Sequence, residues 1–306
     1  MEVNKIYEGD ALEVLKTLPK ESVDMCITSP PYWSLRDYEA EGQLGAEEHY
    51  QEYIDKLCDI FDEVKRMIFP HGTCWVNIGD SYSSSGARGS GEGEKLSGAL
   101  SYKVHQRRAG KTDLPPKSLI GIPERFCLEM QKRGWIRRNT IIWYKPNCMP
   151  SSVTDRFTVD FEYLYFFVKN QKYYFEQQYE DLKEVSKIRM KYPASNPGAK
   201  AKSGQYSIRE DFAYNLDVEG RNKRCVWKVA TKPNREAHFA SYPPDLVAIP
   251  IKAGSPPGGV VLDPFMGSGT TGIEAQRLNR NWLGVEINPE YVKIANKRLS
   301  QKTFMI

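Results

Sequence analysis

The sequence has few cysteines and histidines, and none of them has the spacing used by metal sites or disulfide frameworks. Its six cysteines are scattered over 306 residues without a CxxC pair, and its four histidines are isolated from one another. We therefore expect neither a zinc site nor disulfides, and the chain suits a reducing cytoplasm. We assign no metal ligand and no catalytic histidine.

Long apolar runs and a strong excess of one charge are also absent. No stretch approaches the roughly 18 apolar residues that a membrane span needs. The first residues, MEVNKIYEGD, show no basic-then-apolar leader, so we expect no secretion signal and no membrane partner. Lys and Arg number 43 against 39 Asp and Glu, a net charge of +4. This mild excess permits a polyanionic partner without requiring one.

The chain does show a regular alternation of strands and helices. Near the start, the predicted strands are NKIYEGD, SVDMCIT and TCWVNIGD; the predicted helices are ALEVLKTLP and residues 50–68, which PHG ends. A helix (SLIGIPERFCLEMQKRGW) and two strands (NTIIWY and FEYLYFFVK) follow, and the rhythm returns after His238. This order predicts an α/β fold with a doubly wound, mostly parallel sheet.

Two segments break this rhythm. Residues 83–117 contain six glycines and seven basic residues against three acidic ones, so we predict a long mobile basic loop. Residues 183–224 carry ten basic residues against five acidic, with interleaved tyrosines; this is either a solvated surface excursion or an inserted module. We divide the chain into α/β parts at 1–82, 118–170 and 238–306, separated by the loop 83–117 and an insert at 171–237.

The stretch VVLDPFMGSGTTG predicts a strand that turns sharply into a helix. Gly267 and Gly269 allow the backbone to approach a ligand closely, and the free N–H groups of the helix start can bind an anion. About 20 residues further on, Glu286 stands at the tip of the next predicted strand, where a carboxylate can accept hydrogen bonds from both ribose hydroxyls. This pattern predicts a nucleoside-binding crevice, although a tight turn without a ligand would look similar.

The same glycines spell GxGxxG, which would also fit a dinucleotide. The residues beside them favour another ligand. Asp263 would repel a pyrophosphate but could bind an ammonium. Pro264 and Phe265 would form an apolar wall. The hydroxyl groups of Ser268 and Thr270 could donate hydrogen bonds to a carboxylate. An amino acid joined to a nucleoside, as in S-adenosylmethionine, suits this set best.

TSPPYW, at 28–33, together with DPFMGSGTT, at 263–271, resembles the paired motifs of DNA amino-methyltransferases. The catalytic motif precedes the cofactor motif, as in the β group, where a target-recognition region lies between them. The resemblance implies a Rossmann-like methyltransferase fold with an inserted target-recognition region. It also implies that a methyl group passes from S-adenosylmethionine to double-stranded DNA, leaving S-adenosylhomocysteine. Further partners implied by the resemblance are a second copy of this chain, as a homodimer, and a cognate restriction endonuclease.

The chemistry of the first motif agrees with this resemblance. An exocyclic base amine is a poor nucleophile because its lone pair is conjugated into the ring. The Ser29 hydroxyl and the Pro30 carbonyl would accept hydrogen bonds from its two hydrogens, and Pro30 and Pro31 would hold both acceptors in fixed directions. Tyr32 offers a face on which a flipped base can stack. Methyl transfer is then direct, without a covalent enzyme intermediate.

Other residues complete the predicted site. The cofactor set gains Asp10, which could equally cap a helix, Phe239, which could equally be a core aromatic, and Asn288. The predicted DNA-binding residues are Trp33, Lys145, Arg221, Lys223 and Arg224.

The identity of the methylated atom is less defined by the sequence. Serine at the first motif position favours N4 of cytosine, with N6 of adenine as the alternative. Methylation of C5 of cytosine is disfavoured because it needs a cysteine nucleophile in a suitable loop. Three other functions explain less. A protein amide N-methyltransferase normally has the two motifs in the reverse order and would leave the basic insert idle. A nicotinamide-dependent oxidoreductase leaves TSPPYW without a role, and the intact motifs argue against a DNA-binding regulator without activity.

Overall fold

The computed structural model describes residues 1–35, 42–83, 111–182, 220–231 and 242–302. It divides into two compact units, of which unit 1 comprises Met1–Glu176 with Cys225–Ile306 and unit 2 is Gln177–Arg224. Phe239, the middle of the predicted basic loop and most of the predicted insert lie outside the described residues. The roles predicted for those segments stay predictions.

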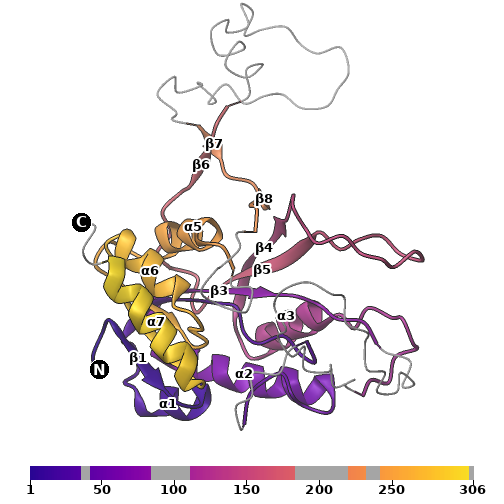
Figure 1. Cartoon of the computed structure of the whole chain (residues 1–306). Helices are drawn as coiled ribbons and strands as arrows, with labels where there is room; N and C mark the ends of the chain where they lie inside the picture. Colours follow the sequence, from indigo (N-terminus) through magenta and orange to yellow (C-terminus); the bar gives the residue numbers. More distant parts are fainter. Residues whose placement is uncertain (36–41, 84–110, 183–219, 232–241, 303–306) are drawn as a thin grey trace, which may run out of the picture. The chain divides into compact units, whose positions relative to one another are not determined.

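Unit 1 is built on an eight-stranded sheet (Figure 1). The strands lie in the order β1 (Lys5–Glu8), β10 (Asn281–Glu286), β9 (Val260–Asp263), β2 (Val23–Thr28), β3 (Ile68–Ile78), β5 (Phe161–Val168), β4 (Ile136–Tyr144) and β8 (Val226–Lys228). Strand β5 runs antiparallel to its neighbours, β3 and β4, and the other pairs of adjacent strands are parallel. The mostly parallel sheet confirms the predicted fold class.

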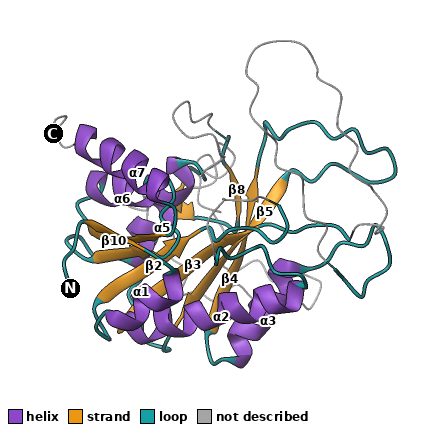
Figure 2. Cartoon of the chain, turned by 60° about the horizontal axis from the view of Figure 1, so that its bottom comes forward, coloured by secondary structure: helices purple, strands orange, loops and turns teal. Residues whose placement is uncertain are grey.

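Helices cover both faces of this sheet (Figure 2). One face packs against α1 (Ala11–Thr17), α2 (Tyr50–Met67) and α3 (Ile122–Lys132), and the other against α5 (Pro244–Gly254), α6 (Thr270–Arg277) and α7 (Pro289–Lys302). Successive side chains of β2 alternate between the two cores: Cys26 joins the first, while Met25 and Ile27 join the second. A strand covered on both faces is near-continuously apolar, as VDMCIT is apart from the half-buried Asp24 and the terminal Thr28.

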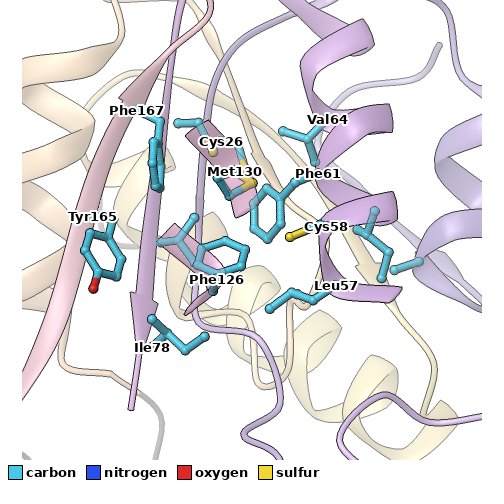
Figure 3. Close-up of a cluster of buried hydrophobic side chains, with 14 of the residues drawn as sticks. Cys26, Leu57, Cys58, Phe61, Val64, Ile78, Phe126, Met130, Tyr165 and Phe167 are labelled. Atoms are coloured by element: carbon cyan, nitrogen blue, oxygen red, sulfur yellow. The ribbon is translucent and has the colours of Figure 1, made fainter. Parts of the chain in front are cut away.

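The first core is dense in aromatic rings (Figure 3). Phe61 and Cys58 of α2 meet Phe126 of α3, Phe167 of β5 and Cys26 of β2, and all five are fully buried. The rings of Phe61 and Phe126 have centroids 5.4 Å apart. Fully burying one such apolar side chain stabilises the fold by roughly 1.5–3 kcal/mol. This packing gives β2 and β3, which carry the site, a rigid support.

Two predicted boundaries were wrong. The third strand begins at Ile68, directly after α2, and contains the PHG that was expected to separate helix from strand. The strand can include these residues because the register between β2 and β3 shifts between Val23 and Met25. The strands also approach closely at Gly72, where a Cβ would lie 2.6 Å from the Asp24 carbonyl oxygen and only glycine fits. The helix predicted over SLIGIPERFCLEMQKRGW is shorter, because Gly121 has φ +76°, in the left-handed region, and α3 begins after it.

The described part of unit 2 is a short antiparallel pair, β6 (Tyr179–Glu180) with β7 (Arg221–Asn222). Glu180 forms ion pairs with Arg221, at 2.8 Å, and with Arg224, at 2.7 Å. Among the described residues, no helix is both long and apolar enough to cross a membrane.

Candidate active site

A cavity of about 350 Å³ opens where the carboxyl ends of the parallel strands meet. It lies beside the contact between β2 and β9, where the sheet changes winding direction: α2 follows β2 on one face, and α6 follows β9 on the other. Such a switch point is where open α/β sheets bind ligands. The volume suits a small-molecule site.

One end of the cavity is formed by the turn after β2. Ser29, Pro30, Pro31 and Tyr32 all line it. The Pro31 carbonyl accepts a hydrogen bond from the Tyr53 hydroxyl at 2.8 Å, which ties the turn to α2. The Ser29 hydroxyl and the backbone at Pro30 are therefore held at the cavity wall by a braced, proline-stiffened turn.

The ring of Tyr32 lies directly against the backbone of Gly79, just after β3. A Cβ at Gly79 would lie 2.6 Å from Tyr32 Cε2, closer than real Cβ atoms approach. Only glycine leaves this space, so the position of the Tyr32 ring depends on it. No feature of the sequence pointed to Gly79.

Replacing Gly79 by alanine is expected to push the Tyr32 ring out of place. If that ring holds the reacting group, activity should fall by roughly 10²-fold, a loss that a misplacement of about 1 Å can cause. Cofactor affinity should stay unchanged, because the glycine loop is not involved. Single-turnover kinetics and calorimetric cofactor titration would measure the two effects, and a wild-type rate would contradict this role of Gly79.

The hydroxyl of Tyr32 belongs to a polar cluster that sequence reasoning missed. It donates to Glu162 Oε2 at 2.6 Å, and Asn77 Nδ2 donates to the same oxygen at 3.0 Å. Lys145 Nζ forms an ion pair with Glu162 Oε1. Burial, and then the charge of Glu162, raise the pKa of Tyr32, so its phenol stays protonated. The available signal was a lone carboxylate in the otherwise aromatic and apolar strand FEYLYFFV.

The other end of the cavity is formed by the turns after β1, β9 and β10. Lining residues that were predicted to bind the cofactor are Asp10, Pro264, Phe265, Gly267, Ser268, Thr270 and Glu286. Glu286 Oε2 accepts the N–H of Gly267 at 2.8 Å, and its Oε1 accepts that of Asn288 at 2.9 Å. Burial raises the pKa of Glu286, which these N–H groups oppose. The carboxylate thus holds the glycine loop while facing the cavity.

The position of Asp10 is compatible with both roles considered for it, as a helix cap and as a cofactor-binding residue. Its Oδ1 accepts the N–H of Glu13 at 3.0 Å and so caps α1, and the residue also lines the cavity.

Asp263 has different partners from those expected. It is fully buried, and it accepts hydrogen bonds from Thr28 Oγ1 at 2.6 Å, from the Phe265 N–H at 3.0 Å and from the hydroxyls of Thr271 and Tyr242. Burial raises the pKa of this carboxyl, whereas the two threonine hydroxyls lower it. Asp263 does not line the cavity but anchors the loop that does, so its predicted contact with an ammonium stays a prediction.

Several predicted residues lie away from the cavity wall. Trp33 is buried and donates from Nε1 to the Glu47 carbonyl at 3.0 Å. Gly269 has φ +84°, and a Cβ there would lie 3.1 Å from Ala295 Cβ, so it permits close packing of α6 on α7. Asn288 Oδ1 accepts the N–H of Glu290 at 2.9 Å at the start of α7. Lys145, unlike these three, lines the cavity and pairs with Glu162; its predicted contact with a phosphate stays a prediction.

The comparisons with known proteins agree with this geometry. A family model described as DNA methylase matches residues 23–297. Type II methyltransferase M.SmaI of Serratia marcescens is 41% identical over 299 residues, covering 97% of this chain and 91% of its own length. Type II methyltransferase M.Cfr9I of Citrobacter freundii is 42% identical over 295 residues, covering 96% and 87%.

Solved structures share the fold. The PvuII DNA methyltransferase, which is cytosine-N4-specific, matches with a TM-score of 0.64 over 97% of this chain and 86% of its own; at 20% identity it supports the fold alone. TTHA0409 from Thermus thermophilus, in complex with S-adenosyl-L-methionine, matches with a TM-score of 0.58 at 26% identity, over 97% of this chain and 95% of its own.

Proposed function

Because the chain belongs to the N6/N4 DNA methylase family, we propose that it methylates N4 of cytosine within a defined DNA sequence. The observation that carries the choice of base is the serine at the first position of the SPPY motif, held at the cavity wall. Relatives named type II methyltransferases support a role in restriction-modification, in which methylation protects DNA from a cognate endonuclease.

The methyl donor in this family is S-adenosylmethionine, and the donor set at the glycine-loop end of the cavity fits it. A carboxylate at the tip of β10 matches the ribose hydroxyls, and Phe265 offers an apolar surface. Ser268 and Thr270 supply hydroxyls for a carboxylate, next to the start of α6. When bound, S-adenosylmethionine supplies a methyl group activated by a sulfonium.

The other end of the cavity suits the exocyclic amine of a base. Ser29 Oγ and the Pro30 carbonyl are acceptors on a braced turn, so they need no rearrangement to meet two amine hydrogens. The Tyr32 ring packs against Gly79 and borders the cavity, so a flipped base that enters the cavity could stack on this ring. Flipping costs a few kcal/mol, which stacking and edge hydrogen bonds offset.

The test is incubation of the full chain with radiolabelled S-adenosylmethionine and DNA of mixed sequence, followed by digestion and nucleoside chromatography. Label in N4-methylcytosine supports the proposal. Label in N6-methyladenine overturns the choice of base and favours the alternative target. Label in protein instead of DNA would overturn the substrate class.

We also predict that unit 2 contributes to DNA binding through its cations, among them the half-buried Lys223 and the exposed Arg224. Changing both Lys223 and Arg224 to alanine should weaken binding and reduce the slope of log K against log salt by about 2, roughly one per lost phosphate contact. Fluorescence anisotropy at several salt concentrations measures the slope. The matched control is Lys16→Ala, an exposed cation on α1. A slope that is unchanged in the double variant would count against this interface.

A further inference from the structure

Glu162 occupies an unusual position for a carboxylate. It lies on β5 with only 16% of its side chain exposed, and it lines the cavity at the end that holds the SPPY motif. Three donors converge on it: the Tyr32 hydroxyl, the Asn77 amide and the Lys145 ammonium. The neighbouring aromatic ring of Trp143 is also near Lys145, whose Nζ lies 4.6 Å from its centroid. The function proposed above does not use this carboxylate.

A short row of hydroxyl groups connects Glu162 to the serine of the motif. Ser29 Oγ donates to Tyr32 Oη at 3.4 Å, and Tyr32 Oη donates to Glu162 Oε2 at 2.6 Å. In this direction each hydroxyl gives its proton toward Glu162, so the lone pairs of Ser29 Oγ remain to accept from the cavity. A group that binds there through an N–H would complete an unbroken path from its nitrogen to a carboxylate.

We propose that Glu162 is the acceptor of the proton that the base amine loses, and that Ser29 and Tyr32 carry it there. The inference rests on the proposed placing of the amine beside Ser29, and it applies to cytosine and adenine alike. It gives Tyr32 a second task through its hydroxyl, in addition to the stacking face of its ring.

The proton balance of this step closes within the chain. As the base nitrogen forms its bond to the methyl carbon, the sulfur–carbon bond breaks and the sulfur keeps that electron pair. One N–H proton passes to Ser29 Oγ, the Ser29 proton passes to Tyr32 Oη, and the Tyr32 proton passes to Glu162 Oε2. The base leaves as a neutral methylamine, both hydroxyls are restored, and Glu162 is a neutral acid until it releases its proton to water.

The other described carboxylates near the cavity are committed elsewhere. Asp263 is fully buried and bound by its hydroxyl and N–H donors, and Glu286 holds the glycine loop at the far end. Asp80 accepts three backbone N–H groups, including those of Gly121 and Ile122 at the start of α3, and Asp10 caps α1. Glu162 is the described carboxylate that a hydrogen-bonded path joins to Ser29.

Lys145 and Asn77 give this acceptor its properties. The Lys145 ammonium donates to Oε1 and the Asn77 amide donates to Oε2, which fixes the orientation of the carboxylate and keeps Oε2 beside the Tyr32 hydroxyl. The raised pKa of Tyr32 keeps its hydroxyl a donor rather than a phenolate. Protons therefore move along the path only when the amine supplies one.

Two conservative variants test the relay in the full chain with cofactor and target DNA. Tyr32→Phe keeps the stacking ring but removes the bridging hydroxyl, and Glu162→Gln keeps the shape but removes the proton acceptor. Each should lower the single-turnover rate by roughly 10²-fold, in the range of general acid–base catalysis. The double variant should be no slower than the slower single variant, because both changes interrupt one path. Glu129→Gln, on α3, is the matched control.

Three readouts separate a relay from a purely structural role. Wild-type protein should show a solvent deuterium isotope effect on single turnover, with a curved proton inventory because several protons move; both variants should lose the curvature. Cofactor affinity should stay within about twofold of wild type, a difference below about 0.5 kcal/mol, because Glu286 and the glycine loop are unchanged. The fluorescence of 2-aminopurine placed at the target position of bound DNA should also match that of wild type. Wild-type rates, or an unchanged curved inventory, in both variants would overturn the relay. If Ser29→Ala retains full activity, the proposed placing of the amine fails instead.

Discussion

Replacing Ser29 by alanine is expected to reduce methyl transfer by roughly 10²- to 10³-fold, the range seen when one preorganised hydrogen-bonding group is removed from an active site. The serine hydroxyl is one of the two acceptors that we assign to the amine, and it begins the path toward Glu162. Cofactor affinity should be preserved, because the glycine loop and Glu286 lie at the other end of the cavity. Single-turnover transfer of labelled methyl groups and calorimetric titration measure the two quantities.

Tyr32→Ala should show the same pattern, with the added loss of a stacking face worth about 1–3 kcal/mol per base. The control for the serine variant is Ser300→Ala, at an exposed position of α7 whose hydroxyl donates to the Lys297 carbonyl. If both site variants fold but lose cofactor binding, the assignment of the two cavity ends is wrong. If both retain full activity, the SPPY turn has another role.

The sequence predicted the fold because its strands are covered on both faces. The near-continuous apolar run at 23–28 identified β2, and the alternation of strands and helices indicated the order of elements and the mostly parallel sheet. The start of β3 was missed because Pro70 and Gly72 usually end an element. Here a register shift beside Val23 accommodates them, and such a shift has no signature in one strand alone.

The site residues also fall into those that the sequence motifs predicted and those that depend on the pairing of distant strands. Ser29 was identified from the SPPY motif, and Glu286 from its place at the tip of a predicted strand. Both line the cavity, as expected. Gly79 was missed because it reaches Tyr32 through the parallel pairing of β2 with β3, and Glu162 was missed because the antiparallel pairing of β3 with β5 brings it beside the same ring. Sequence spacing cannot reveal a pair 130 residues apart in the chain. The register of two strands determines it, and that register depends on the whole core.

Asp263 shows the same limit from inside a motif. Its place before the glycine loop suggested a ligand contact, but no property of DPFMGSGTT reveals that Thr28 and Tyr242 also donate to it. The carboxylate joins β2, β9, the glycine loop and the approach to α5, so it organises the cavity from behind its wall. A functional motif can thus contain residues whose contribution is to hold the others in place.

Asp263→Ala is accordingly expected to lower the free energy of unfolding by about 3–5 kcal/mol, the range for removing one partner from a buried charged network. The change leaves the hydroxyls of Thr28 and Thr271 and the N–H of Phe265 without their acceptor in a fully buried site, and each such donor costs about 1–3 kcal/mol. Urea unfolding without cofactor, followed by circular dichroism, measures the loss.

The pH dependence of this network gives an independent check. Because burial raises the folded-state pKa of Asp263 above its unfolded value, the ionised carboxylate costs stability at neutral pH, and that cost disappears as the pH falls through the folded pKa. Asp263→Asn should remove this contribution, so its unfolding free energy should depend less on pH on the acid side than that of the wild type. Asp55→Ala, at an exposed site on α2, is the control and should change stability by less than about 0.5 kcal/mol. Equal urea midpoints for Asp263→Ala and Asp55→Ala would show that the hydroxyl groups find other acceptors, and Asp263 would then be free for the ligand contact that the sequence suggested.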